Sequence, residues 1–406
     1  MFKASEQSLQ GSTISRRLRK LDSARLDCIS DHLLAPVGNP ASNPEGYLGD
    51  YRLVGIDGTR FTLQNTSAIL EKVPKAKTAQ SPVGDDQQEV AFPQIYACSL
   101  VELGPHNPLA VSVGCGGDGE LTVATRLLDR LEPGDMLLGD CLYGVGWFLH
   151  QLVQSSRCGA FLLKVFSEQT STAVERLDDG SWIVEVKVRS RTRPADIIAT
   201  HHVREIRYQI QSTDADGKTT IETYRLWTNL TDCRKHPASK MAGLYNTRWE
   251  HESYYKELKL GMKKHKYLNS QLLETAQIEI LSMVWASALV AAERQRIHEK
   301  NIETRSSDLK DTHQQQPLRS IRFDLVRENL ATLWTLYESL GELITKQQYQ
   351  GFVDKFTNEA IMFRSQKRRR RTCPRKVRQS VTHWPKLRER VQSKQPVKIT
   401  VIERGA

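Results

Sequence analysis

The sequence predicts an α/β protein built on a mixed β-sheet with helices on both faces, a β-rich insertion and further helices at the C-terminal end. Three observations favour this class. Residues 51–166 alternate short apolar runs with helical spacing, residues 180–232 hold β-like runs without a helical signal, and residues 237–344 return to helical spacing. Short loops between the first strands indicate an antiparallel meander, whereas helices between the later strands allow parallel pairing.

The N-terminal half is predicted to hold a helical segment and the first part of the core. Helical spacing over 13–35 and a Pro/Gly/Asn-rich stretch over 36–46 predict a helix and a linker within segment 1–46. Residues 47–168 form the first part of the core. Its expected strands cover 51–64, 94–103, 109–115, 135–143 and 159–166, and its expected helices cover 119–131 and 146–156.

The C-terminal half begins with a β-rich insertion. This insertion, 169–235, is expected to hold strands over 181–188, 201–210 and 220–230. Helices over 243–266 and 269–298 complete the core within segment 236–300. A helical region follows over 301–363, with a loop at 301–317 and a helix at 323–344, and a basic tail covers 364–406.

The charge distribution favours a polyanionic partner. The net charge is +11, yet residues 364–406 alone carry 15 Lys and Arg against 2 acids, so residues 1–363 are near −2 (11 − 13). A second basic cluster, 234–266, has 9 Lys and Arg against 3 Glu. Two basic zones favour nucleic acid as the partner. A disordered basic tail that binds any polyanion is the alternative.

The sequence gives no sign of export or of a membrane span. The N-terminal residues contain no apolar stretch typical of a signal peptide, and the longest uncharged apolar run, Ile280 to Ala292, has 13 residues where a span needs about 20. The seven cysteines include no C-x-x-C pair, which argues against a zinc site and a disulfide framework. We expect a cytoplasmic protein in a reducing environment.

Three carboxylates on three elements form a candidate metal site. Asp57 is placed at the end of the first strand, Asp140 at the end of the fourth, and Glu252 on the helix after the insertion. If those two strands are neighbours, their ends bring the two aspartates together, and a helix carboxylate completes a cage of oxygens that suits Mg²⁺ or Mn²⁺. Alternatively, Asp57 starts a turn with Gly58 and Asp140 caps the following helix.

The predicted helix at 243–266 has an unusual face. At 100° per residue, Tyr245, Arg248, Glu252 and Lys259 share a stripe about 60° wide, with Lys256 beside it. A solvated face with i,i+4 ion pairs such as Glu252–Lys256 is the ordinary interpretation. The Tyr and Arg on the same stripe suggest a second interpretation, in which cations and an aromatic ring hold a polyanion near a carboxylate.

These residues also carry a resemblance to a known family. The pattern Y-x2-R-x3-E-x6-K, formed by Tyr245, Arg248, Glu252 and Lys259, resembles the signature of the DDE transposases of the fourth insertion-sequence family. "GIDGTRF" around Asp57 and "LLGDCLYG" around Asp140 resemble the two Asp motifs of that family. In the second motif, Cys141 and Leu142 replace the usual Arg-Gly, whereas Tyr143 is kept. The resemblance covers about residues 13–380.

The resemblance implies a ribonuclease H-like core in which Asp57, Asp140 and Glu252 bind two Mg²⁺ ions, with Mn²⁺ as a substitute. The implied reaction is metal-dependent cleavage at the ends of the transposable element, followed by attack of the freed 3′-OH on target DNA. In related enzymes the second strand is cut through a DNA hairpin. The implied setting is a bacterial cytoplasm, at the nucleoid.

The resemblance also implies contacts with double-stranded DNA and a homodimer on it. Tyr245, Arg248 and Lys259 would contact phosphates near the transposon end, with Lys256 beside them. Trp249 and Trp227 are each interpreted either as core residues, which is the favoured interpretation, or as rings that stack on an unpaired base. A catalytically silent DNA-binding regulator and a nuclease without strand transfer are the alternatives. His201 and His202 are adjacent in a β-like run and are predicted to be a poor metal pair, because they point to opposite faces. His251 is predicted to be structural, and Asp135 is predicted to begin a strand.

Overall fold

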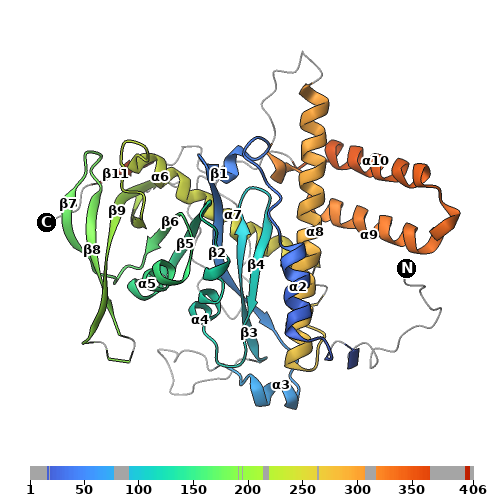
Figure 1. The fold of residues 1–406 in the computed structure, drawn as a ribbon, viewed down its shortest axis with the longest axis horizontal. Helices are drawn as coiled ribbons and strands as arrows, with labels where there is room; N and C mark the ends of the chain where they lie inside the picture. The colour runs from blue at the N-terminus through green and yellow to red at the C-terminus, as the bar shows by residue number, and fades with distance from the viewer. Residues whose placement is uncertain are drawn as a thin grey trace. The chain divides into compact units, whose positions relative to one another are not determined.

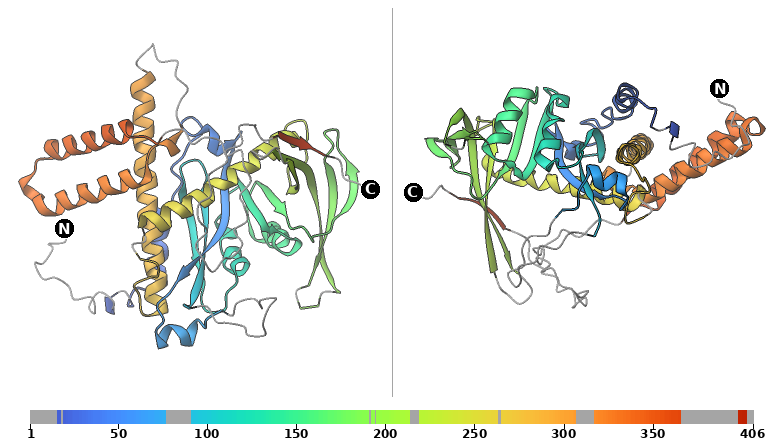
Figure 2. Two further views of the ribbon diagram at one scale, coloured as in Figure 1. Left: turned by 180° about the vertical axis from the view of Figure 1, so that it is seen from behind. Right: turned by 90° about the horizontal axis from the view of Figure 1, so that it is seen from below.

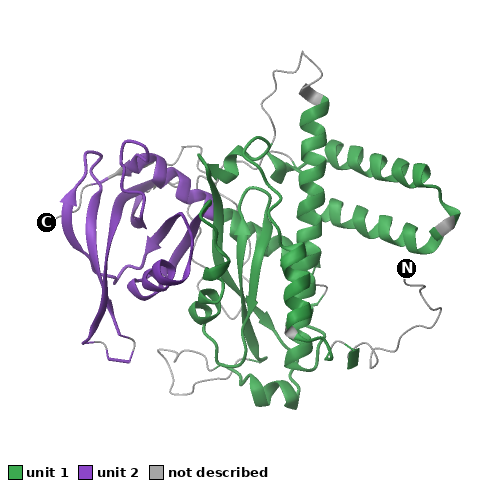
Figure 3. Cartoon of the chain, viewed as in Figure 1, with its two compact units in different colours: residues 1–135, 249–365 green, residues 136–248, 366–406 purple. Residues whose placement is uncertain are grey.

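The computed structural model describes residues 16–17, 19–76, 91–190, 192–193, 195–213, 219–262, 265–306, 317–365 and 398–402. The chain forms two compact units (Figure 3). Unit 1 comprises residues 1–135 and 249–365, and unit 2 comprises residues 136–248 and 366–406. The chain therefore crosses from one unit to the other between Asp135 and Met136 and returns between Arg248 and Trp249.

Unit 1 contains an antiparallel meander (Figure 1). Its strands are β1 (Tyr47–Leu48), β2 (Tyr51–Thr62), β3 (Gln94–Glu102) and β4 (Asn107–Val113). The meander was predicted, but the placement of Asp57 at a strand end was wrong, because β2 continues for five residues beyond it. Asp57 and Gly58 pair with Ser99 and Cys98 on β3, and this pairing overrides the turn tendency of an Asp-Gly dipeptide.

Helices cover both faces of the unit 1 strands (Figures 1 and 2). The sulfur of Cys98 lies 3.5 Å from the carbonyl oxygen of Glu120 on α4, whereas the next residue, Ser99, contacts α7 on the other face. Successive side chains of a strand point to opposite faces, so α4 and α7 lie on opposite sides. The helices of unit 1 are α2 (Ser23–Leu33), α3 (Ser67–Lys72), α4 (Glu120–Thr125), α7 (Trp249–Glu257), α8 (Leu273–Ser306), α9 (Phe323–Leu340) and α10 (Lys346–Met362).

The longest helix, α8, forms one wall of the unit 1 core. Its Ala276, Ile280 and Val284 are buried in a cluster with side chains from β2, β3 and α7. Over Leu273–Thr304 this helix is long and apolar enough to cross a membrane, but half of its apolar window is buried inside the structure, as in a core helix. The loop predicted at 301–317 is wrong up to Ser306, where α8 ends, and residues 307–316 lie outside the described residues.

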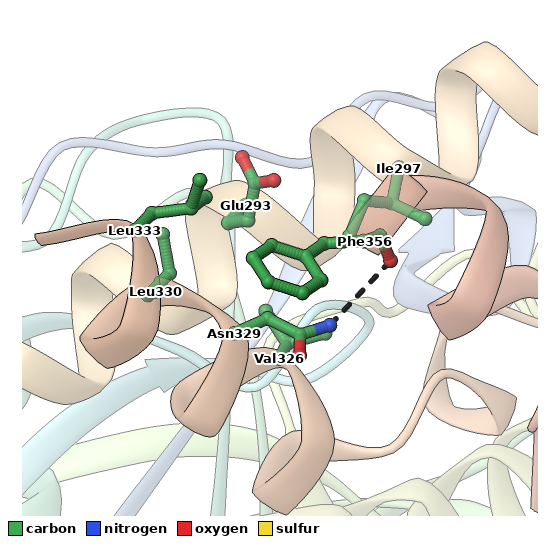
Figure 4. Close-up of a pocket in the computed structure, with 7 residues that line it drawn as sticks. All are labelled: Glu293, Ile297, Val326, Asn329, Leu330, Leu333 and Phe356. Atoms are coloured by element: carbon green, nitrogen blue, oxygen red, sulfur yellow. Dashed lines mark hydrogen bonds between the residues drawn. The ribbon is translucent and has the colours of Figure 1, made fainter. Parts of the chain in front are cut away.

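A hairpin of α9 and α10 packs on the far half of α8 (Figure 1). Thr345 caps α10 through a capping box with Gln348. Figure 4 shows where the three helices meet, around Phe356 and Asn329, whose side-chain nitrogen donates a 3.5 Å hydrogen bond to the Phe356 carbonyl. The cavity left there has a volume of about 10 Å³, which is room for about one water molecule, so the helices pack closely.

Unit 2 carries the mixed part of the sheet. Its strands are β5 (Asp135–Gly144), β6 (Ala160–Val165), β7 (Thr172–Arg176), β8 (Trp182–Arg189), β9 (Ile197–Thr213), β10 (Thr219–Thr228) and β11 (Lys398–Val401). β5 and β6 are parallel and are joined by α5 (Gly146–Ser155), as predicted. The remaining pairs, β6–β10, β10–β9, β9–β8, β8–β7 and β9–β11, are antiparallel. The predicted mixed sheet is therefore confirmed.

Two features of unit 2 differ from the expectations. The insertion has four strands, because the short β7 pairs with β8 although its side chains are all exposed. The tail contributes β11, while residues 366–397 and 403–406 lie outside the described residues. Trp227 is fully buried and donates a 3.2 Å hydrogen bond to Glu205, so it is a core residue and has no accessible face for a base.

The predicted single helix at 243–266 is wrong. The chain instead forms α6 (Ala238–Tyr245), a 3₁₀ turn (Asn246–Arg248), α7 and a π-helical turn (Leu258–Met262), with residues 263–264 outside the described part. Asn and Thr are weak helix formers, and the 3₁₀ turn falls where the chain changes units. The stripe calculated for one continuous α-helix therefore does not hold.

Candidate functional site

Asp57 projects from the face of β2 that α7 covers. It pairs with Ser99, whose hydroxyl contacts α7, and paired residues of antiparallel strands share a face. The next residue, Gly58, lies on the α4 side, where a Cβ atom would meet Glu120 at 2.5 Å. One carboxylate oxygen of Asp57 accepts a 2.8 Å hydrogen bond from the Gly58 N–H. The strand and this hydrogen bond to the next residue together orient the Asp57 side chain.

Helix α7 brings Glu252 to the same face of β2. His251 is fully buried against Gly55, where a Cβ atom would lie 2.7 Å from the His251 ring, so only glycine permits this approach. The Tyr255 hydroxyl donates a 2.7 Å hydrogen bond to the carbonyl oxygen of Asp57. Glu252 lies about 60–100° around the helix from these two side chains. Glu252 therefore lies at the edge of the buried face of α7 that His251 and Tyr255 form, and it is partly exposed.

The Tyr255 phenol is a permanent hydrogen-bond donor. Burial raises its pKa well above the ordinary value, and the nearby thiol of Cys98 and carboxylate of Asp57 raise it further. Ser99 donates a 2.9 Å hydrogen bond to the same phenol oxygen. The hydroxyl thus stays protonated at any working pH and links α7 to the backbone of Asp57.

A buried ionic cluster holds the other side of α7. His106 contacts Glu250 and Glu257 at 2.8 Å each, and Arg319 and Arg294 bind the same two carboxylates at 2.8 and 3.3 Å. Burial opposes the charged imidazole, but the attraction and hydrogen bonds of Glu257 and Glu250 outweigh it and raise the pKa of His106 to about 9. At neutral pH this imidazolium clamps both ends of α7.

Asp140 lies in unit 2, inside β5 and not at its end as predicted, because β5 continues through Gly144. One of its carboxylate oxygens accepts a 2.8 Å hydrogen bond from the Leu142 N–H. This contact uses the backbone N–H of Leu142, so it does not depend on the side chain at that position. The Tyr143 side chain is fully buried in the core.

Tyr245 and Arg248 lie close to Asp140 within unit 2. The Tyr245 hydroxyl donates a 3.3 Å hydrogen bond to the Gly139 carbonyl, and the Arg248 guanidinium lies 6.0 Å from the Tyr245 ring centre. Burial raises the pKa of Tyr245, Arg248 lowers it, and Asp140 raises it. Both side chains are less than 10% exposed, so a solvated helix face does not describe them.

The remaining candidate DNA contacts differ in accessibility. The Lys259 ammonium donates a 3.0 Å hydrogen bond to the Arg60 carbonyl and lies 5.4 Å from the Phe61 ring centre, against the end of β2. Lys256 is exposed. Trp249 is 43% exposed, so the favoured interpretation of this residue as a core side chain is wrong. Lys256 and Trp249 are therefore the exposed members of this set.

The donor chemistry fits a hard divalent cation. Asp57, Asp140 and Glu252 offer only carboxylate oxygens, which Mg²⁺ and Mn²⁺ prefer. Among the residues that the structure describes, no group of three or more His, Cys, Asp or Glu side chains is assembled closely enough to hold a metal ion. The three carboxylates thus suit such a metal by the chemistry of their donor atoms alone.

The histidines set aside in the sequence do not form a metal pair. His201 contacts His150 on α5 at 3.0 Å, whereas its neighbour His202 is exposed. Asp135 starts β5 and forms a 2.7 Å ion pair with Arg52. These side chains stabilise local structure.

A family model described as "Transposase DDE domain" matches residues 48–287, more than half of the chain. The chain belongs to the DDE transposase family. This confirms the resemblance seen in the sequence, and the matched range contains Asp57, Asp140 and Glu252.

Individual relatives are more distant. "Transposase InsG for insertion sequence element IS4" of Escherichia coli (strain K12) is 22% identical over 239 residues, which are 59% of this chain. The match spans about half, 51%, of that relative's length. A cryo-EM structure of the piggyBac transposase synaptic complex with hairpin DNA matches at 11% identity with a TM-score of 0.38, covering 75% of this chain and 57% of that one.

Three residues of this DDE transposase were missed as parts of the site: Ser99, His106 and Tyr255. Ser99 is a polar residue in the apolar run "YACSLVEL", and Tyr255 follows Glu252 by three positions. These are weak signals, because serine in a strand and tyrosine in a helix are common. His106 lies in "GPHNP" and gives no stronger signal, because its positive φ of 57° is a feature of the folded backbone.

Proposed function

We propose that this DDE transposase cuts DNA at the ends of its transposable element and joins the freed 3′-OH to target DNA. Asp57, Asp140 and Glu252 are proposed to hold two Mg²⁺ ions, and Mn²⁺ would substitute. When bound, such ions stabilise the negative charge on the attacking and leaving oxygens of a phosphoryl transfer. The reaction takes place in the cytoplasm, at the nucleoid.

The observation that carries the proposal is the arrangement on β2. Asp57 and the helix that bears Glu252 share one face of the strand, and the Tyr255 hydroxyl joins them at 2.7 Å. Both residues are partly exposed. Because the helix that bears Glu252 is hydrogen-bonded to the backbone of Asp57, a shared role for the two acids is supported.

The DNA-binding residues are proposed to act at different stages. Lys256 and Trp249 are exposed and would contact phosphate and an unpaired base at once. Arg248 and Tyr245 are buried beside Asp140, so their contact with a phosphate would follow DNA docking. Lys259 would contribute its charge from the end of β2. We also propose a homodimer on DNA, held by the C-terminal helices from residue 323 onward.

An excision assay in cells tests the reaction. The donor plasmid carries a marker between the two DNA segments that flank this reading frame. We expect excision by the wild type and none above background by Asp57→Asn, Asp140→Asn or Glu252→Gln, because an amide neither carries the charge nor replaces a bridging carboxylate. Excision by all three variants would refute the site assignment.

The same assay separates the alternatives. No excision by the wild type, with binding to the flanking DNA intact, would identify a catalytically silent regulator. Cleaved donor DNA without insertion of the marker at new positions would identify a nuclease that lacks strand transfer. The family membership favours the transposase over both.

The basic tail is expected to supply part of the phosphate contacts. Replacing Arg369 and Arg370 with Gln should reduce the slope of log affinity against log salt by up to about 1.8, since each phosphate contact contributes about 0.9. The control replaces Lys20 and Arg157, two exposed residues outside the two basic zones and the C-terminal helices, with Gln and makes the same change in net charge. Fluorescence anisotropy between low and moderate salt measures both. Equal slopes for the two variants would exclude a specific role of the tail.

A further inference from the structure

We propose that His251, Ser99 and Tyr255 form a positioning chain that fixes the backbone of Asp57 against α7 and so sets the spacing between Asp57 and Glu252. None of the three belongs to the transposase signature or to the motifs around the aspartates. The proposal rests on the proposed function, because it takes Asp57 and Glu252 as metal ligands. All its members lie in unit 1.

The hydrogen bonds are donated in one direction, from His251 towards Asp57. The His251 Nε2 atom lies 3.1 Å from the Ser99 hydroxyl, the Ser99 hydroxyl donates to Tyr255 at 2.9 Å, and Tyr255 donates to the Asp57 carbonyl at 2.7 Å. Because the Ser99 proton is directed to Tyr255, its oxygen accepts from His251, which places the imidazole proton on Nε2. Every hydroxyl in the chain therefore has both a donor and an acceptor, and the chain ends on the residue that bears the carboxylate.

The three residues of the positioning chain lie in the protein interior, where apolar side chains are the usual occupants. Ser99, His251 and Tyr255 are 1%, 0% and 8% exposed, and Tyr255 belongs to the cluster of buried hydrophobic side chains that β2, β3, α7 and α8 form. A buried hydroxyl weakens a core unless it is hydrogen-bonded, and the Ser99 and Tyr255 hydroxyls are hydrogen-bonded in one defined geometry. Polar residues here thus indicate that the register of α7 on β2 matters.

The contacts constrain the two carboxylates from both elements. Tyr255 and His251 flank Glu252 on α7, while Ser99 is paired with Asp57 across β2 and β3. A slide or rotation of α7 would break the 2.7 Å bond to the Asp57 carbonyl before it altered the apolar packing. Ligand constellations need positions held within about 0.5 Å, and the proposed role of these contacts is to restrict the movement of α7 relative to Asp57.

The test compares two neighbouring tyrosines. Tyr255→Phe removes only the hydroxyl that reaches Asp57. Tyr254→Phe is the matched control, because Tyr254 is equally buried, its ring lies 5.4 Å from that of Tyr255, and its hydroxyl contacts Ser287 on α8 at 3.4 Å. Full-length wild type and variants are titrated with Mn²⁺ alone, and free Mn²⁺ is measured by electron paramagnetic resonance. Thermal melts of the metal-free proteins record stability.

We expect Tyr255→Phe to weaken Mn²⁺ binding about tenfold, which is typical for loss of an outer hydrogen bond to a ligand residue. Tyr254→Phe should bind as the wild type does, while both variants lose thermal stability. Ser99→Ala, which interrupts the chain in its middle, should weaken binding in the same direction as Tyr255→Phe. Cleavage by Tyr255→Phe should recover at high Mn²⁺ concentration.

The outcomes separate this proposal from the proposed function. If Glu252→Gln loses Mn²⁺ binding but Tyr255→Phe binds as the wild type does, the positioning chain is refuted and the metal site stands. If Tyr254→Phe and Tyr255→Phe lose binding equally, the effect is one of general stability and the positioning role is refuted as well. If Glu252→Gln binds Mn²⁺ as tightly as the wild type, the metal assignment itself fails.

Discussion

Replacing Glu252 with Gln should reduce metal-dependent DNA cleavage on the order of a thousandfold, the loss typical when a group that stabilises transition-state charge is removed. Glutamine keeps the size of the side chain at the edge of the buried face of α7, so the helix keeps its contacts through His251 and Tyr255. What is lost is the negative charge that a divalent cation requires. A time course with end-labelled DNA and Mg²⁺ measures the effect.

The same variant should bind DNA at least as tightly as the wild type. Without metal, the Glu252 carboxylate repels phosphate, and the amide removes this repulsion. The control is Glu250→Gln, which lies on the opposite side of α7 and pairs with His106 and Arg319. It should lower stability but keep cleavage. Cleavage by Glu252→Gln at the wild-type rate, or equal losses in both variants, would show that Glu252 is not a metal ligand.

The succession of strands and helices along the chain could largely be predicted from the sequence, because it depends on local patterns. The alternation in "YRLVGIDGTRFTLQ" and the helix signal between β5 and β6 are each contained in short windows. Helix α10 lies within the predicted helical region 301–363, but its bounds were not predicted, since "KQQYQGFVDKFTNEAIM" has few apolar residues and its position depends on packing against α8 and α9. The break at Asn246–Arg248 was missed because one helical periodicity was assumed over 243–266, although Asn246 and Thr247 are weak helix formers.

The candidate site also contains residues that local patterns predict and residues that they do not. Resemblance of short motifs located Asp57, Asp140 and Glu252, and the family match confirms that they lie in a DDE transposase domain. The residues that hold α7 in place could not be predicted, because Ser99 and His106 contact residues about 150 positions later in the chain. A single sequence contains no signal for such a contact, since the two partners share neither a window nor a periodicity.

The second large effect is expected from pH. The pKa of His106 is raised from 6.5 to about 9 in the folded protein. A raised pKa means that the folded state holds the proton more tightly, so the stabilisation is fully present below pH 6.5 and is lost as the pH rises through 9. The shift corresponds to about 3 kcal/mol in the free energy of unfolding, a large part of the roughly 5–15 kcal/mol of a typical protein.

The charged groups around His106 determine this sign. Glu250 and Glu257 on α7 attract the proton, Arg294 on α8 opposes it, and Arg319 binds Glu250 from the other side. Urea unfolding from pH 6 to 9.5 measures the effect, and His106→Gln is the comparison, because it keeps a hydrogen-bonding side chain that does not titrate. The wild type should lose stability across this range while the variant changes little. Parallel profiles for the two proteins would mean that His106 is neutral in the folded state, and the clamp on α7 would then rest on Arg294 and Arg319 alone.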